Sequence, residues 1–340
     1  MNVAELTRAL VDIESVTENE GGVGAYLLDY LSKLAAGTGG RVEKMDVAPG
    51  RFNVLAIWGR PIVTLSTHMD TVPPFFASRE DAEFVWGRGA CDAKGIIAAM
   101  IAAAERLLAA GTRNLALLFV VGEERNSAGA SVASESPRGS KFLINGEPTE
   151  NQLALASKGV LRYELVARGK MAHSAYPELG ESAIDALLDA LDAIRRVPLP
   201  RDPVLGPSTM NIGTISGGRA PNVIADVAKA EILVRLVGDA APIREAFARA
   251  VGPRAQLNEV LCIPPIHFQS VDGLPTTVVS FTTDVPVFGR TWGEPLLLGP
   301  GSIHVAHTAE ERISKRDLEN AVGMYVDVVK KLLATPEART

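Results

Sequence analysis

The chain has 340 residues, of which 47% are hydrophobic and 22% charged, and its formal net charge is −6 at pH 7. This balance is typical of a globular protein long enough for two domains, so it excludes a disordered chain and argues against a nucleic-acid partner. Its two cysteines, Cys91 and Cys262, are too few for a disulfide framework and fit a reducing compartment. The first residues lack the basic start of a signal peptide, and no stretch reaches ~18 uninterrupted apolar residues. We therefore expect a cytoplasmic protein with no membrane partner.

The first half of the chain alternates helical and strand patterns. Apolar residues recur either at helical spacing or in the short continuous runs typical of strands covered on both faces. The expected elements are helices over 3–13, 22–36 and 94–110, and strands over 53–58, 61–67, 115–121 and 141–145. This alternation predicts an α/β domain with a mainly parallel sheet and helices on both faces.

The pattern changes near residue 159. A strand (160–167), a helix (180–196), two strands (208–215 and 222–236), a helix (240–251) and a strand (255–262) follow one another. That order predicts an inserted α+β domain of the ferredoxin-like type. A strand over 276–281, a Gly/Pro loop over 293–301 and a helix over 315–334 then return to the first domain. The expected domains are therefore 1–158 with 270–340, and 159–269.

Five short polar segments contain the candidate functional residues. They are THMD (67–70), GRGACDAKG (87–95), GEE (122–124), NGEP (145–148) and GPGSIHVAH (299–307). Three of the first four directly follow predicted strands, where open α/β sheets form their sites.

Each segment by itself has a simpler explanation. A pair such as His68 and Asp70 most often belongs to a turn, Asp92 is equally well explained as a helix cap, and adjacent acids such as 123–124 are usually solvated. Together, however, imidazole and carboxylate groups from strand ends suit zinc or a similar ion. Two adjacent ions need more carboxylates, one of which bridges them.

The order HMD, GRGACDAKG, GEE, GEP and a late GPGS…AH resembles the dinuclear zinc aminoacylase and carboxypeptidase family. That family includes acetylornithine deacetylase, succinyl-diaminopimelate desuccinylase, aminoacylase and glutamate carboxypeptidase, and the resemblance covers nearly the whole chain. It implies two divalent metal ions, with zinc preferred and cobalt or manganese as alternatives. The implied metal ligands are His68, Asp92, Glu124, Glu147 and His307. His304 is close in sequence, but the Ala-His pattern followed by Thr-Ala-Glu-Glu favours His307.

The resemblance also implies how these ligands divide between the two ions. Asp92 would bridge them. His68 and Glu147 would complete one site, and Glu124 and His307 would complete the other.

Three further residues would act on the chemistry rather than bind metal. Asp70 would orient the ring of His68, as residues behind metal ligands commonly do. Glu123 would be the general base that takes a proton from the attacking water and passes it to the leaving amine. His173, in the inserted domain, would stabilise the developing oxyanion.

The implied substrate-binding residues are Asn222, Arg235, Gly301 and Ser302. Arg235 and the backbone N–H groups of residues 299–302 suit a substrate carboxylate. A turn asparagine and a surface arginine at the end of a strand remain open alternatives for Asn222 and Arg235.

The resulting functional hypothesis is a hydrolase that cleaves the amide bond of an N-acyl amino acid, with acetylornithine deacetylase the best single match. The alternative within the family is a dipeptidase or carboxypeptidase, including release of lysine or ornithine from a carrier protein. A remote alternative is an inactive scaffold protein, which the complete ligand set argues against. Because the inserted domain resembles the lid of dimeric relatives, a homodimer formed through it is expected.

Overall fold

A computed structural model describes residues 1–339. The chain folds into two compact units. The first contains Met1–Leu155, Phe268–Thr277 and the chain from Thr283 onward, and the second contains Ala156–His267 and Val278–Thr282. Most of the second unit is thus one continuous insertion in the first.

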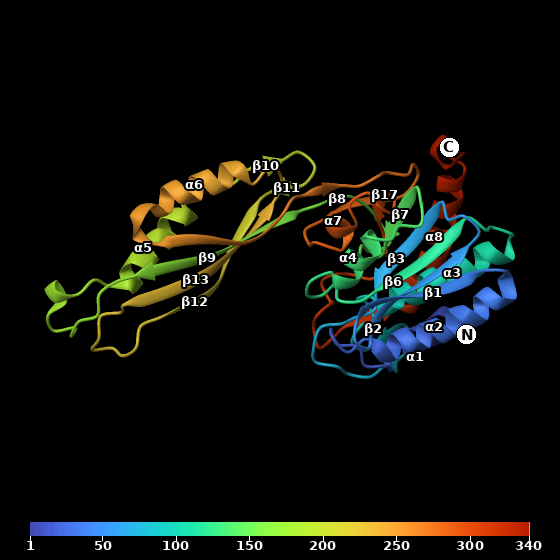
Figure 1. Cartoon of the computed structure of the whole chain (residues 1–340), viewed down its shortest axis with the longest axis horizontal. Helices are drawn as coiled ribbons and strands as arrows, with labels where there is room; N and C mark the ends of the chain where they lie inside the picture. The colour runs from blue at the N-terminus through green and yellow to red at the C-terminus, as the bar shows by residue number, and fades with distance from the viewer. Residues whose placement is uncertain (340) are drawn as a thin grey trace. The chain divides into compact units, whose positions relative to one another are not determined.

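The first unit holds both helices and strands (Figure 1). Its helices are α1 (Val3–Val11), α2 (Gly21–Thr38), α3 (Lys94–Ala109), α4 (Ala128–Ser134), α7 (Val285–Phe288) and α8 (Lys315–Leu333), followed by a 3-10 turn at Pro336–Arg339. Its strands are β1 (Arg41–Ala48), β2 (Arg51–Trp58), β3 (Val63–His68), β4 (Arg79–Glu80), β5 (Phe84–Trp86), β6 (Leu115–Val120), β7 (Phe142–Asn145), β8 (Leu153–Ser157), β16 (Thr276–Val279), β17 (Glu294–Leu297) and β18 (Arg312–Ser314).

The main sheet of the first unit is parallel at its centre. Its strands follow the order β1-β2-β6-β3-β7-β17-β8. Parallel pairing joins β6 to β3, β3 to β7 and β7 to β17, whereas β1, β2 and β8 are added antiparallel on the two sides. The carboxyl ends of β3, β6 and β7 therefore meet at one edge of the sheet, as Figure 1 shows.

Helices cover both faces of this sheet. Alternate residues of β2 point in opposite directions: Val54 and Ala56 join the core formed with α1, α2, α3 and α8, whereas Leu55 and Ile57 join the core formed with α4 and α7. This period of two is what a strand buried on both faces requires. The fold class expected from the sequence is confirmed.

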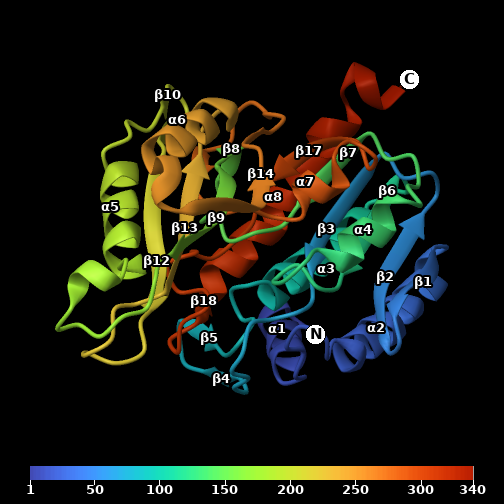
Figure 2. The same cartoon turned by 60° about the vertical axis from the view of Figure 1, so that its left-hand side comes forward.

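The second unit is built around an antiparallel sheet ordered β12-β13-β9-β14. Its elements are β9 (Gly159–Arg168), a 3-10 turn (Pro177–Leu179), α5 (Ala183–Arg195), β10 (Arg201–Asp202), β11 (Gly206–Pro207), β12 (Thr209–Gly217), β13 (Val227–Leu236), α6 (Ala241–Val251), a second 3-10 turn (Gly252–Arg254), β14 (Gln256–Ile263) and β15 (Ile266–His267). Helices α5 and α6 pack on one face of the sheet and share one core with it (Figures 1 and 2). This is the expected ferredoxin-like arrangement.

Some local predictions were wrong. The stretch 293–301, expected to be a loop, contains β17, because Pro295–Leu297 are buried and pair with β7 despite the flanking glycine and prolines. The strand expected over 222–236 begins only at Val227. Strand β1 was not predicted, because half of its residues are polar and only Met45 is buried.

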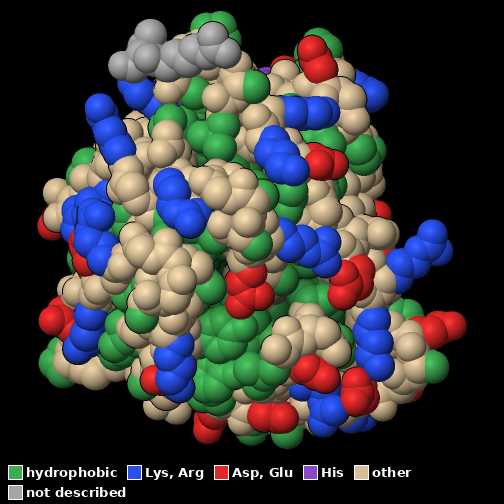
Figure 3. All heavy atoms as spheres, turned by 90° about the vertical axis from the view of Figure 1, so that its right-hand side faces the viewer, with side chains coloured by type: hydrophobic (Ala, Val, Ile, Leu, Met, Phe, Trp, Pro, Cys, Tyr) green, Lys and Arg blue, Asp and Glu red, His purple; other side chains and the backbone are tan. Residues whose placement is uncertain are grey.

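On the face shown in Figure 3, acidic and basic side chains are interspersed. Within residues 1–339, none of the helices combines the length and apolar character that a bilayer crossing needs.

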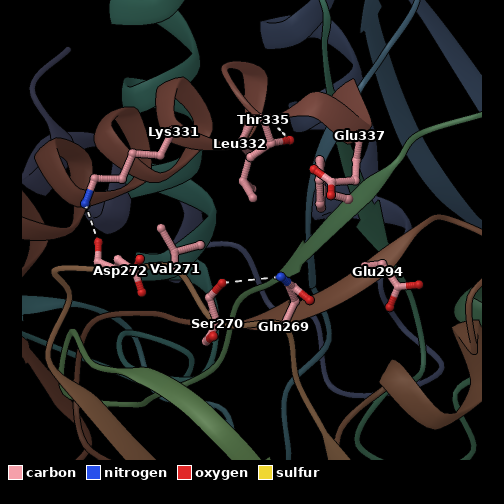
Figure 4. A pocket seen from close by; sticks show the side chains of 10 residues that line it. Gln269, Ser270, Val271, Asp272, Glu294, Lys331, Leu332, Thr335 and Glu337 are labelled. Carbon is pink, nitrogen blue, oxygen red and sulfur yellow. Dashed lines mark hydrogen bonds between the residues drawn. The ribbon is translucent and has the colours of Figure 1, made fainter. Parts of the chain in front are cut away.

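A cavity of about 430 Å³ opens in the first unit beside the end of α8 (Figure 4). The residues lining it are Phe142, Gln269, Ser270, Val271, Asp272, Glu294, Lys331, Leu332, Thr335 and Glu337. None of them belongs to the predicted site, so the candidate chemistry lies elsewhere.

Candidate metal centre

The predicted ligands are brought together by the ends of three parallel strands. Strand β3 ends at His68, β6 is followed by Glu123 and Glu124, and β7 is followed by Glu147. His68 lies opposite Val120 of β6 in the parallel register, so the residues after these strands emerge at the same edge. Asp92 reaches that edge from the loop that precedes α3.

Asp92 lies between two histidines. Its Oδ1 is 2.9 Å from Nε2 of His68, and its Oδ2 is 3.4 Å from Nε2 of His307. Nε2 of His307 is also 2.9 Å from Oε1 of Glu124. One carboxylate with each oxygen facing a different imidazole has the geometry needed of a bridging ligand.

Three of the five predicted ligands form a compact cluster. One ligand atom each from His68, Asp92 and Glu124 lies within 4.8 Å of the others. His307 adjoins this cluster, whereas the backbone N–H of His304 donates to the hydroxyl of Ser302 and its side chain is exposed. His307 also has a positive φ of 62°, which a non-glycine residue adopts only when its surroundings impose it.

Glu147 supplies a test of whether a cation fits. It is 4% exposed, and its Oε1 has no hydrogen-bond partner. Burial and the neighbouring Glu123 carboxylate raise its pKa well above the ordinary range. A buried carboxylate oxygen without a donor is costly, and a cation beside it removes that cost. The residues present therefore fit a divalent metal centre.

Asp70 is fully buried and contacts both His68 and the loop after β6. Its backbone oxygen is 3.0 Å from Nδ1 of His68, and its carboxylate is 3.6 Å from the same atom. The carboxylate also accepts the backbone N–H groups of Gly122 (2.9 Å), Glu123 (3.1 Å) and Glu124 (3.2 Å) and the hydroxyl of Thr17. Asp70 thus fixes both the ring of His68 and the loop after β6.

Glu123 is partly buried among other acids. Burial raises its pKa well above the ordinary range, the charge of His68 lowers it, and the nearby carboxylate of Asp284 raises it further. Within residues 1–339 the Glu123 side chain forms no hydrogen bond, so its carboxylate is available to exchange a proton.

Sequence analysis missed three buried charged residues near the cluster. Asp284 precedes α7, its Oδ1 has no hydrogen-bond partner, and burial raises its pKa to about 7. Arg88 and Glu311 form a buried ion pair of 2.6 Å behind the Asp92 loop. Arg88 stands in the GRGACDAKG segment and Glu311 in the Thr-Ala-Glu-Glu turn, but no spacing rule links residues so far apart.

The 299–302 loop packs beside the metal cluster rather than leaving all its polar groups free. Gly301 has a φ of +83°, and a Cβ atom there would lie 2.6 Å from Sγ of Cys91. The hydroxyl of Ser302 donates to Glu150, and the N–H of Gly299 donates to Thr149. The Gly299 N–H, one of the backbone donors expected to face a substrate carboxylate, is therefore already engaged, and so is the Ser302 hydroxyl.

The remaining predicted residues lie in the second unit, at opposite ends of its sheet. The N–H of Ser174 donates to the backbone oxygen of Asn222, and His173 forms a bridge with Val223, so His173 and Asn222 are neighbours. Arg235 lies near the other end of β13, opposite Val160. Burial lowers its pKa, and no acidic side chain among residues 1–339 pairs with it.

The chain is similar to several known proteins. The sequence profile of peptidase family M20/M25/M40 matches residues 64–252. A probable carboxypeptidase of Aspergillus flavus is 40% identical, over 96% of this chain and 88% of that protein. A tripeptidase of Staphylococcus aureus has a similar structure, with a TM-score of 0.84, 21% identity and 98% of both chains covered.

A dinuclear metal-binding peptidase of family M20 from Bacillus subtilis also shares the fold, with a TM-score of 0.67, 17% identity, and 97% of this chain and 98% of that chain covered. The family expected from the order of the polar segments is thus confirmed. A match of this extent places the chain in peptidase family M20/M25/M40, so it is a metal-dependent hydrolase.

Proposed function

We propose that the chain hydrolyses an amide bond whose amine side is an amino acid with a free α-carboxylate. The observation that carries this proposal is the placement of Asp92 between His68 and His307, with the carboxylates of Glu123 and Glu124 beside them. That arrangement supports two metal sites sharing one ligand, with an uncoordinated acid in reach of the reacting atoms.

Each side chain of the centre has a distinct part in this chemistry. His68 and Glu147 would hold one ion and Glu124 and His307 the other, with Asp92 common to both. When bound, two divalent cations polarise the scissile carbonyl and lower the pKa of the attacking water. Zinc suits this set of imidazole and carboxylate ligands, and cobalt or manganese can also be bound by such a set.

Glu123 would act as general base and then as general acid. Its raised pKa in the metal-free protein shows a carboxylate that holds a proton readily, which favours delivery to the leaving amine. Positive charge from bound ions would lower that pKa. Asp70 supports this role because it holds the backbone N–H of Glu123.

Arg235 supports recognition of a carboxylate. A half-buried guanidinium with no acidic partner in the described part of the chain favours a negatively charged ligand. A carboxypeptidase, a dipeptidase and an N-acyl amino acid deacylase all present such a group.

His173 is proposed to act on the substrate of a neighbouring subunit. Arg235 lies eight positions along β13 from Val227, ~26 Å at ~3.3 Å per residue, and His173 pairs with Val223, before the start of that strand. A dipeptide-sized substrate is much shorter, which favours supply of the two side chains by different chains. This separation supports a homodimer in which the inserted domains exchange histidines.

The finer choice of substrate is between the peptidase and deacylase branches. The 299–307 segment resembles the acetylornithine deacetylase branch, and this resemblance is the only support for N-acetylornithine. The Aspergillus flavus relative, in contrast, is named a probable carboxypeptidase. We therefore propose as first choice a short peptide that loses its C-terminal residue, and as second choice N-acetylornithine. In either case we propose that the reaction takes place in the cytoplasm.

The test is a panel of N-acetyl amino acids, N-succinyl amino acids and dipeptides, each as the free acid and as the carboxamide, with zinc-loaded protein. At least one free acid should be hydrolysed, and its carboxamide should be a far poorer substrate. Arg235→Met should remove that preference, whereas Arg162→Met, an exposed arginine on the adjacent β9, should keep it. Equal kcat/KM for acid and carboxamide would refute carboxylate recognition.

A further inference from the structure

We propose that Glu311 is a positioning residue that holds the loop of residues 87–92 so that the Asp92 carboxylate is set between the two metal sites. This inference rests on the proposed function, because it concerns the ligand that the two ions would share.

Glu311 is 1% exposed, and both of its carboxylate oxygens bind this loop. Oε1 accepts the backbone N–H groups of Gly89 (2.9 Å), Cys91 (3.2 Å) and Asp92 (3.1 Å). Oε2 accepts Nη1 of Arg88 at 2.6 Å. One side chain from a distant part of the sequence thus gathers four donors of a single loop.

Arg88 ties this contact to the surrounding chain. It is 2% exposed, its Nε donates to the backbone oxygen of Pro74, and its guanidinium lies over the ring of Phe76. The N–H of Gly87 donates in turn to the backbone oxygen of Glu311. The loop is therefore attached at its start as well as along its length.

Asp92 is held from two directions. Its N–H is bound by Glu311, while its carboxylate oxygens face His68 and His307. Because Glu311 accepts the backbone N–H of the residue that carries this carboxylate, the direction of the Asp92 side chain depends on it.

Asp70 shows the same device on the other ligand-bearing loop. Its carboxylate accepts the N–H groups of Gly122, Glu123 and Glu124, just as Glu311 accepts those of the Asp92 loop. Asp70 and Glu311 are thus two buried carboxylates outside the predicted ligand set, and each accepts backbone hydrogen bonds from a loop that carries a predicted ligand. A need for fixed ligand geometry explains why both loops are held in this way.

A purely structural role is the alternative, since a buried ion pair also affects folding. The nearby Lys94 does not hold the loop in the same way, because its Nζ donates to the backbone oxygen of Ile13. The two roles differ in what they predict for metal binding. A structural residue alters the stability of metal-free and metal-loaded protein equally, whereas a positioning residue also alters the affinity for metal, and thus the stabilisation that metal provides.

The experiment compares Glu311→Ala and Glu311→Gln with Leu107→Ala in the full chain. Leu107 is fully buried near the end of α3, on the side away from the Asp92 loop along the chain, so its truncation should destabilise the fold without changing the site. Zinc affinity is measured by competition with a chelator, and the rise in Tm on adding zinc is measured by calorimetry.

Glu311→Ala should bind zinc about 10–100-fold more weakly, the usual range for residues behind metal ligands, and should show a smaller zinc-induced rise in Tm. Glu311→Gln should lose less affinity, because its amide oxygen still accepts the loop N–H groups. In Glu311→Gln the new side-chain N–H group faces the guanidinium of Arg88, so two donors oppose each other. Adding Arg88→Met removes this opposition and should recover part of the lost zinc affinity. Leu107→Ala should keep wild-type affinity.

Wild-type zinc affinity in both Glu311 variants, with Tm lowered as in Leu107→Ala, would overturn the positioning role and leave the proposed function standing. Failure of the wild-type chain to bind zinc, cobalt or manganese would overturn both.

Discussion

The carboxylates around the site fall into two groups by what their oxygens contact. Asp92 and Glu124 face histidines, and Glu147 leaves one oxygen without a partner, whereas Asp70 and Glu311 are saturated with backbone N–H groups. The first group is available to a cation, and the second is already bound to the protein. Residue type alone does not separate these roles, since all five are simple acids.

The adjacent acids Glu123 and Glu124 should respond differently to the same substitution. Glu123→Gln should keep both metals and lose at least ~10²-fold in turnover, because a general acid–base group is removed. Glu124→Gln should instead weaken one metal site, because an amide is a poorer ligand than a carboxylate. Metal content by mass spectrometry and kcat on the same preparations check this, and the reverse pattern would exchange the two roles.

Metal affinity should rise with pH because of His307. Hydrogen bonds to Asp92 and then to Glu124 raise its pKa to about 10 in the metal-free protein, from an ordinary value near 6.5. A metal needs the neutral imidazole, so binding displaces a proton below pH ~10. From pH 7 to pH 9 affinity should increase about tenfold per unit through this group alone.

The stability of the metal-free protein should move in the opposite direction. A pKa raised by folding stabilises the folded state fully below pH ~6.5, and that contribution is lost as pH rises through about 10. The zinc-induced rise in Tm should therefore grow with pH in the wild type. His307→Ala should flatten the dependence, and a pH-independent affinity in the wild type would contradict the assignment of His307.

At the scale of elements, the position of α3 depends on close contact with the loop before it. A Cβ atom on Gly95, in the first turn of α3, would lie 2.3 Å from the backbone oxygen of Ala90. A Cβ atom on Gly323, inside α8, would meet nothing within 4 Å. There is thus no room for a side chain at Gly95, whereas there is room for one at Gly323.

Replacing each glycine by alanine should therefore change stability in opposite directions. Gly95→Ala should lower the free energy of unfolding by ~1–3 kcal/mol, the usual cost of overpacking, and should weaken metal binding by displacing the Asp92 loop. Gly323→Ala should raise it by ~0.5–1 kcal/mol, because glycine is costly inside a helix. Urea denaturation of both variants tests this. Stabilisation by Gly95→Ala would mean that the loop is not packed against α3.

At the scale of the whole molecule, the proposed exchange of histidines makes activity depend on assembly. His173→Ala should bind both metals and lose ~10²–10³-fold in kcat, as expected for an oxyanion donor. Mixed with inactive Glu123→Ala, it should regain activity, because one mixed site has both residues. A mixture of Glu123→Ala with the double variant should stay inactive. No recovery in the first mixture would contradict the exchange between subunits, and wild-type kcat in His173→Ala would remove His173 from the proposed mechanism.

Sequence periodicity predicted most elements of both units, because apolar spacing reports burial directly. It failed for β17, a buried strand that contains Pro295 and follows Gly293, and for β1, an edge strand in which polar residues are as frequent as apolar ones. The family and the metal-dependent chemistry were also accessible, because five short segments in a fixed order are specific even though each is weak alone.

The sequence by itself therefore determined the fold class and the family, and it supplied a candidate ligand set made of short local patterns. Tertiary structure alone decided that Glu311 supports that set and that Asp70, already expected to orient His68, also holds the loop after β6. The carboxylates of Asp70 and Glu311 accept hydrogen bonds from loops 52 and 222 residues away, and Arg235 is separated from His173 by the length of a sheet. These relations have no local signature, because they depend on which strand ends and loops the sheet brings together, and only the folded chain fixes that.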